Sequence, residues 1–275
     1  LIILGSGGRG ENFLFPDQDN AFILDDYRDG DHSASDPFFV ELAERMTKDI
    51  DAVGLPLCRG FVMATNPLWR KTRAQWRDQV AYWMSSRSPV TLRYCDIFFD
   101  FSHGFGRADY AAGLREYVTA MAARNSGFIK DMFAIQESHN VALGWFGRLL
   151  TEPDDDGHTG MINLKYNGTL PLVEAVRLLS LKHGIARTST LGRLDGLREC
   201  DAIDDDAHDY LTGGLNHLTR LLLRQQLADF GAGNKVTNFV PKNSLTRREK
   251  EYLADCFRAI QDLRGKLSTE FSGEF

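Results

Sequence analysis

The chain begins with a four-residue apolar run and then reads Gly5-Ser6-Gly7-Gly8-Arg9-Gly10-Glu11; five residues later comes Asp17-Gln18-Asp19. The apolar run, Leu1 to Leu4, predicts a strand that ends in a phosphate-type glycine loop. A second apolar run, Ala21 to Leu24, follows the acidic pair and predicts a neighbouring strand. Flexible backbone suited to phosphate groups therefore lies next to two carboxylates suited to a divalent cation.

Three of these glycines also match the dinucleotide-binding pattern. Gly5, Gly7 and Gly10 spell G-x-G-x-x-G, and an acidic pair follows the next predicted strand. Only ten residues separate Gly10 from that strand, however, and Pro16 is one of them. A parallel crossover needs a dozen residues or more, usually with a helix that proline would interrupt, so we exclude a Rossmann fold.

The two aspartates have the spacing of a metal-binding pair. In an extended chain, residues i and i+2 face the same side with Cα atoms about 6.5 Å apart, so the carboxylates of Asp17 and Asp19 can converge on one hard cation. The alternative is a solvated acidic turn, because aspartate is common in turns. The adjacent glycine loop favours the metal site.

A third carboxylate is predicted later in the chain. The segment Leu92–Phe101 reads as a strand, with Asp96 and Asp100 on one face and apolar residues on the other. These two aspartates would be about 13 Å apart along a strand, so both cannot bind one ion directly. Asp100 lies near the strand end, just before Gly104, and we choose it as the third carboxylate, with Asp96 as the alternative.

The remainder of this first region predicts helices and one more strand. Asp36 and Pro37 suit a helix start, as cap and first helical residue. Residues 58–64 predict a third strand, and Asn66-Pro67 predicts the opening of another helix. One stripe of large side chains, which we expect in the core rather than in a base-stacking platform, comprises Trp69, Trp76, Val80 and Trp83.

Helical periodicity dominates from Arg107 onward, with no convincing strand. Helices are predicted around 114–121, 172–179, 211–222 and 253–267, and Thr246 with Glu249 forms a capping box before the last of them. The acidic run 154–156 is interpreted as a solvated loop. The predicted fold is an α/β catalytic domain with a small mixed sheet at 1–106, followed by an all-α helical bundle domain at 107–275.

Composition narrows the class of protein. The 275 residues are 43% hydrophobic and 25% charged, with 32 basic and 38 acidic residues and a net charge of −6. This balance argues against a general nucleic-acid binder. The four cysteines form no CxxC pair and suggest reduced thiols and a cytoplasmic setting. No membrane span or signal peptide is visible, and we expect the chain to be a piece of a longer protein.

A phosphate loop and three carboxylates are what metal-dependent nucleotidyl transfer requires, because two Mg²⁺ ions can clamp the attacking and leaving oxygens of an in-line displacement. Amides around Gly5–Gly8, with the Ser6 hydroxyl and Arg9, would hold the β- and γ-phosphates of a nucleoside triphosphate (NTP). Asp100 would ligate the metal ion facing the acceptor and could take the proton from the attacking hydroxyl.

The motif Gly5-Ser6-x-Gly8-Arg9-x-Glu11 with Asp17-Gln18-Asp19 resembles the nucleotidyltransferase superfamily that includes DNA polymerase beta and the kanamycin nucleotidyltransferases. It resembles more narrowly the DUF294 nucleotidyltransferases, relatives of the protein-PII uridylyltransferase and of the glutamine synthetase adenylyltransferase. Cys58-x-Gly60-x-Val62-Met63-Ala64-x-Asn66-Pro67 and Phe98-Phe99-Asp100-Phe101 also resemble that group, as do Asn163-Leu164-Lys165, Thr190 and Arg193-Leu194 in its helical C-terminal substrate-binding domain.

This resemblance implies a Mg²⁺-dependent transferase that moves a nucleoside monophosphate (NMP) from an NTP to a protein or small-molecule hydroxyl in a signal-transduction protein, with cyclic-nucleotide-binding or CBS domains upstream. It implies that Lys165, Thr190 and Arg193 contact the triphosphate or substrate; surface exposure or helix capping is the alternative. Relatives commonly have arginine where this chain has Ser102, which leaves a second hypothesis, a nucleotide-sensing module with little or no activity.

Overall fold

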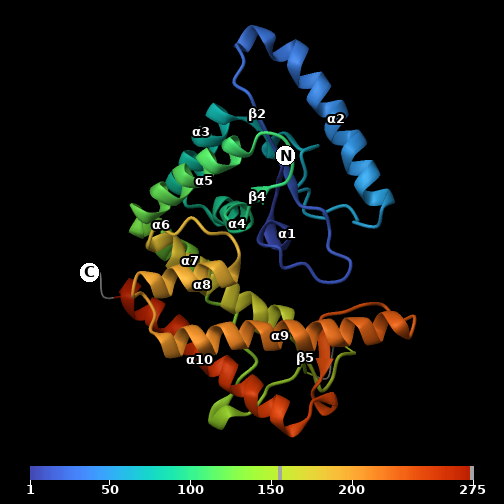
Figure 1. The fold of residues 1–275 in the computed structure, drawn as a ribbon, viewed down its shortest axis with the longest axis vertical. Coiled ribbons are helices and arrows are strands. Elements are labelled where there is room, and N and C mark those ends of the chain that lie inside the picture. Colours follow the sequence, from blue (N-terminus) through green and yellow to red (C-terminus); the bar gives the residue numbers. More distant parts are fainter. Residues whose placement is uncertain (154–156, 273–275) are drawn as a thin grey trace. The chain divides into compact units, whose positions relative to one another are not determined.

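In a computed structural model, which describes residues 1–153 and 157–272, the chain divides into two compact units (Figure 1). The first contains residues 1–128 and 186–189, and the second contains residues 129–185 and the chain from residue 190 onward. Helix α5 (Ala108–Ala123) belongs to the first unit. The expected boundary between two domains after residue 106 stays a prediction.

A four-stranded mixed sheet organises the first unit, in the order β3-β2-β1-β4. The central strand β1 (Ile2–Ile3) pairs antiparallel with both β2 (Asn20–Leu24) and β4 (Ser102–His103), and β2 pairs in parallel with β3 (Arg70–Thr72). The predicted pairing of the first two apolar runs is therefore confirmed, and so is the rejection of a parallel crossover between them.

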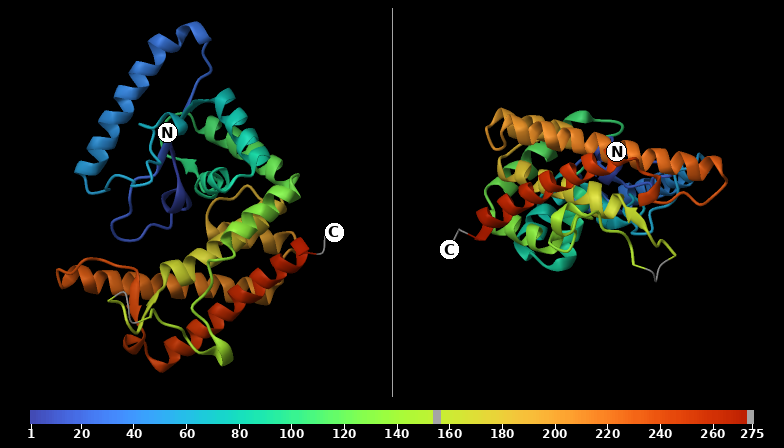
Figure 2. Two further views of the ribbon diagram at one scale, coloured as in Figure 1. Left: turned by 180° about the vertical axis from the view of Figure 1, so that it is seen from behind. Right: turned by 90° about the horizontal axis from the view of Figure 1, so that it is seen from below.

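Helices lie between successive strands of this unit in the chain, and α5 follows the last strand (Figure 2). The helix α3 packs against both α4 and α5. The bounds are α1 (Gly5–Arg9), α2 (His32–Ala52), α3 (Arg73–Ser86), α4 (Pro89–Phe98) and α5. The glycine loop thus contains one short helical turn, α1, between β1 and the acidic pair.

The core of the first unit is rich in aromatic side chains. Trp69, Trp76 and Trp83 are all buried, which confirms that the predicted stripe packs inside. The Trp76 ring stacks on Phe98 with centroids 4.8 Å apart, and its indole Nε1 donates to the Phe22 carbonyl oxygen at 2.8 Å. Because that indole N–H has its partner in β2, α3 is tied to the sheet by a polar contact as well as by packing.

The predicted strand at 92–101 is wrong. Ser88 caps the segment by accepting the Thr91 amide, Pro89 occupies the first turn, and the helix α4 runs to Phe98. The apolar residues therefore obey helical spacing, and aromatic and β-branched composition misled the interpretation. Asp96 lies on α4, whereas Asp100 follows the helix and precedes β4.

Three further expectations for this unit need correction. Residues 58–64 form no regular strand, because a turn at Gly60 with a positive φ of 55° at Phe61 breaks the extended chain. The segment after Asn66 is a 3₁₀ turn followed by β3, and the helix α3 begins only at residue 73. The helix α2 begins at His32, so Pro37 lies inside it.

The second unit is mostly helical, and with the small sheet of the first unit it confirms the predicted fold class. The helix α10 packs against α9 and α7, and α7 packs against α8. The bounds are α6 (Ser126–Gln136), most of which belongs to this unit, α7 (Leu170–Lys182), α8 (Thr190–Glu199), α9 (Asp205–Gly231) and α10 (Arg247–Ser272). The predicted capping box is present at Thr246 and Glu249.

One small sheet was missed here: β5 (Met161–Asn163) pairs antiparallel with β6 (Phe239–Pro241). Three-residue strands are too short for a period-2 pattern to reveal. The acidic run 154–156 lies outside the described residues. Within the described ranges, no helix is both long enough and apolar enough to cross a bilayer.

Candidate active site

The stretch from Asp17 to Asn20 alternates between two sides, as an extended chain must. Gln18 and Asn20 are each 4% exposed, whereas Asp17 is exposed and Asp19 is half-buried. The two amides therefore point into the protein and the two carboxylates point to the opposite side. This places both predicted metal ligands on one side of the chain.

The buried amides attach this stretch to the last turns of α2 and to the chain that follows it. The Gln18 side chain donates to the carbonyl oxygens of Thr47 (3.0 Å) and Leu55 (3.2 Å). The Asn20 side-chain oxygen accepts the Ala64 amide at 3.0 Å. Buried polar groups need such partners, so Gln18 and Asn20 hold residues 55–64 beside the acidic pair.

Cys58, on that held segment, completes a cluster with the two carboxylates. Among the residues that the structure describes, Asp17, Asp19 and Cys58 form the group of possible metal ligands, with ligand atoms within 4.8 Å of one another. Desolvation by burial, and then the hydrogen bond to Asp19, raise the pKa of the Cys58 thiol to about 12. Two carboxylates beside a protonated thiol suit a hard, oxygen-preferring divalent cation such as Mg²⁺.

The glycine turn lies directly against Asp19. Gly5 has a φ of +58°, and a Cβ placed on it would lie 3.1 Å from Asp19 Oδ2. The Ser6 hydroxyl donates to Asn12 Oδ1 at 2.9 Å. The first amides of a helical turn have no acceptor within the helix, so the start of α1 offers N–H donors next to a carboxylate.

Arg9, at the end of α1, lies between two carboxylates. Its Nη1 is 2.6 Å from Asp100 Oδ2, and its Nε is 2.7 Å from Glu11 Oε2. The Asp100 side chain is fully buried, and that of Arg9 is 14% exposed. A buried carboxylate is costly unless it is paired, and Asp100 has a cationic partner.

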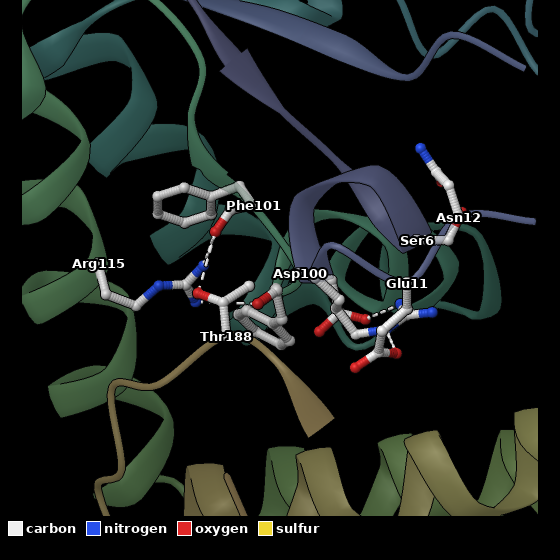
Figure 3. A network of polar contacts seen from close by, with 9 residues as sticks. Ser6, Glu11, Asn12, Asp100, Phe101, Arg115 and Thr188 are labelled. Atoms are coloured by element: carbon white, nitrogen blue, oxygen red, sulfur yellow. Dashed lines mark hydrogen bonds and ion pairs between the residues drawn. The ribbon is translucent and has the colours of Figure 1, made fainter. Parts of the chain in front are cut away.

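The backbone around Asp100 is held by a buried arginine from α5 (Figure 3). Arg115 donates to the carbonyl oxygens of Phe99 (2.9 Å) and Phe101 (2.6 Å), and its guanidinium lies 3.8 Å from the centroid of the Phe101 ring. Thr188 also donates to the Phe101 carbonyl oxygen, at 3.2 Å. The residues on both sides of Asp100 are thus fixed in place.

The three site residues expected from the C-terminal half all lie in the second unit. Lys165 is exposed and begins a π-helical turn, Thr190 is the first residue of α8, and Arg193 lies in the same helix. Arg193 is 1% exposed and Thr190 is fully buried. Their contact with a triphosphate stays a prediction.

Two histidines, His103 near the site and His139 in the second unit, have ordinary partners. His103 contacts the Gly106 carbonyl oxygen, and His139 pairs with the buried Glu174 at 2.9 Å. Neither belongs to the possible metal cluster among the described residues.

Four residues of this region escaped sequence reasoning. Gln18 and Asn20 could have been found, because they alternate with Asp17 and Asp19. Cys58 begins a motif that resembles the family, but neither its place beside the acidic pair nor that of Arg115 beside Asp100 could have been predicted, because these contacts join segments that are distant in the sequence.

Comparison with protein-family models finds two matches. Residues 1–90 match "Putative nucleotidyltransferase DUF294", and residues 126–271 match "Putative nucleotidyltransferase substrate binding domain". No curated protein and no solved structure matches the chain.

Proposed function

Since this chain belongs to the DUF294 family of nucleotidyltransferases, we propose that it transfers an NMP group from an NTP to a hydroxyl of a protein or small molecule, with Mg²⁺. The observation that carries the proposal is the contact between the glycine turn and the acidic pair, where a Cβ on Gly5 would lie only 3.1 Å from Asp19 Oδ2. A phosphate-binding backbone and a cation-binding carboxylate must be this close to bind one metal–triphosphate complex.

The chain's own residues would divide the work. Asp17 and Asp19 would hold the divalent cation, which neutralises triphosphate charge and polarises the reacting oxygens when bound. Amides from Gly5 to Gly7 would orient the β- and γ-phosphates, because the Gly8 amide already donates to the Leu4 carbonyl oxygen at 3.0 Å. In the reaction the acceptor oxygen bonds to the α-phosphorus, the bond to pyrophosphate breaks, and the hydroxyl proton is released. Catalysis then depends mainly on positioning and charge stabilisation.

Lys165, Thr190 and Arg193 would add triphosphate or substrate contacts from the second unit. Support comes from the family match over residues 126–271, described as a substrate-binding domain. The burial of Thr190 and Arg193 excludes only the alternative in which these two are ordinary surface side chains.

The proposed setting is a cytoplasmic signalling protein with regulatory domains upstream of the nucleotidyltransferase. The family resemblance and the four free cysteines support it. The acidic net charge of −6 favours a protein or small-molecule acceptor over nucleic acid.

Incubation with each α-labelled NTP, Mg²⁺ and cell extract tests the proposal and identifies the base. We expect a labelled acceptor with one NTP, and loss of labelling to background in Asp17→Asn and Asp19→Asn. The matched control is Asp51→Asn, an exposed aspartate on α2 that should label normally. Tight NTP binding without any labelled product would instead support the nucleotide-sensing module.

A further inference from the structure

The contacts of Asp100 assign it a different function from that of Asp17 and Asp19. Its carboxylate is fully buried in an ion pair with Arg9 Nη1, while Arg9 Nε binds Glu11. Arg9 thus links Asp100, which lies just before β4, to Glu11, which lies just beyond the end of α1. Each charge in this row has an oppositely charged neighbour, which offsets the cost of burying the Asp100 carboxylate.

The strand β1 separates Asp100 from the acidic pair. On one side of β1, the Leu4 amide donates to the Asp19 carbonyl oxygen at 3.0 Å. On the other side, Ile3 pairs with Ser102, two residues after Asp100. Strands that flank a common neighbour have backbones about 10 Å apart, so Asp19 and Asp100 lie on opposite flanks of β1.

The helix α1 also touches the backbone of Asp100. A Cβ on Gly8 would lie 1.8 Å from the Asp100 carbonyl oxygen, so only glycine permits this approach. The Asp100 side chain contacts α1 at a second point, Arg9. Because Arg115 holds the carbonyl groups of Phe99 and Phe101, these two contacts place α1 on a rigid support.

The positive charge beside Asp100 also disfavours a metal ion on this carboxylate. The Arg9 guanidinium lies 2.6 Å from Asp100 Oδ2. A divalent cation on the same carboxylate would face this fixed positive charge in a region of low dielectric constant, whereas Asp17 and Asp19 already form a cluster of ligand atoms with Cys58.

We propose that Asp100 is a positioning residue that, through Arg9, holds the glycine turn in its phosphate-binding position, and that the divalent cation is bound without it. This inference rests on the proposed nucleotidyltransferase function. In this proposal Asp100 does not bind the metal ion. It affects NTP binding indirectly, by holding the glycine turn.

Mn²⁺ binding, followed by electron paramagnetic resonance without NTP, distinguishes a metal ligand from a positioning residue. This measurement does not depend on enzymatic activity. Asp17→Asn should weaken Mn²⁺ binding by about tenfold or more, since it removes a charged ligand. Asp100→Asn should leave Mn²⁺ affinity within about twofold of wild type, because the residue would act on the phosphates, yet raise the KM for NTP by about tenfold or more. Asp96→Asn, at the neighbouring half-buried aspartate, is the matched control and should change neither.

A second variant covers the case in which Asp100→Asn does not fold, because it leaves Arg9 with a buried unpaired charge. Arg9→Gln combined with Asp100→Asn removes both charges and keeps hydrogen-bonding groups. It should bind Mn²⁺ like wild type and still bind NTP poorly. Arg9→Lys retains a cation at this position, so its KM for NTP should lie between that of the wild type and that of the double variant.

The outcomes are distinguishable. Equal weakening of Mn²⁺ binding in Asp100→Asn and Asp17→Asn overturns the inference and returns Asp100 to the metal site. Loss of Mn²⁺ affinity in Asp96→Asn also overturns it, in favour of that aspartate as an unrecognised ligand. If instead Asp17→Asn binds Mn²⁺ normally, the proposed metal site itself fails.

Discussion

Replacing Gly8 with alanine would insert a methyl group into the contact between α1 and the backbone of Asp100. The new Cβ would lie 1.8 Å from the Asp100 carbonyl oxygen and 2.7 Å from the Ile3 carbonyl oxygen. Ordinary contact begins near 3.4 Å, and both obstacles are backbone atoms that no rotamer change can move. The turn would therefore have to move by about 1.5 Å to restore normal van der Waals separations.

Two costs add up in this variant. Overpacking in a well-packed site typically costs about 1–3 kcal/mol, and a clash with backbone belongs at the upper end. The displacement also strains the hydrogen bond that the Gly8 amide donates to the Leu4 carbonyl oxygen, which is 3.0 Å long in the native protein. The net contribution of such a hydrogen bond to stability is about 1 kcal/mol. We expect the free energy of unfolding of the first unit to fall by about 3 kcal/mol or more.

Function should suffer as well if the variant folds. A displacement of about 1 Å in a positioning element can reduce the rate about a hundredfold, so we expect at least that loss of kcat/KM for NMP transfer.

Urea unfolding followed by tryptophan fluorescence measures the stability change, because Trp69, Trp76 and Trp83 report on the first unit. Gly113→Ala is the control: it lies in α5 with open space around its Cβ position and should gain up to about 1 kcal/mol. Equal stability of Gly8→Ala and wild type would refute the close contact between α1 and Asp100.

Three further predictions concern other parts of the molecule. Arg115→Met should lower the free energy of unfolding by about 2–4 kcal/mol in urea, since the Phe99 carbonyl oxygen loses its Arg115 donor and the Phe101 carbonyl oxygen keeps Thr188 but loses Arg115. Arg224 and then the Thr246 amide lower the pKa of Glu249 from 4.5 to about 2, so its contribution to stability is present above pH 4.5 and disappears as the pH falls toward 2. Thermal melts of Glu249→Gln and wild type should therefore differ at pH 7 and converge at low pH. A thiol reagent at neutral pH should modify the exposed Cys200 rapidly and the buried Cys58, Cys95 and Cys256 only after unfolding.

Each of these three predictions has a result that would contradict it. An Arg93→Met control, on the exposed side of α4, should unfold like wild type, and a similar loss there would remove the argument for Arg115. A pH-independent gap between Glu249→Gln and wild type would contradict the ion pair with Arg224. A rapid thiol reaction that persists in Cys200→Ser would contradict the burial of the other cysteines.

The successes of sequence reasoning share a physical basis in local pattern. The first two apolar runs form adjacent strands, and the tryptophan stripe is buried, because side-chain spacing along one element already reveals which face is apolar. Thr246 and Glu249 cap α10 because a capping box is satisfied within four residues.

The failures arise where two patterns coexist. The segment before Asp100 alternates like a strand but also repeats its apolar residues with helical spacing, and the Ser88 cap with Pro89 decided for the helix. Residues 58–64 have strand-like composition, yet a left-handed residue at Phe61 and the hydrogen bonds to Asn20 hold them as an ordered loop.

The sequence by itself determined the fold class, the adjacency of the glycine turn to Asp17 and Asp19, and the family, because these depend on residues close together in the chain. Only the tertiary structure decided what Asp100 contacts and which residues surround the acidic pair. Arg9 and Asp100 are separated by 91 positions, and Arg115 reaches the same segment from another helix. Such pairings depend on strand order and helix packing, which bring together residues that no local spacing can relate.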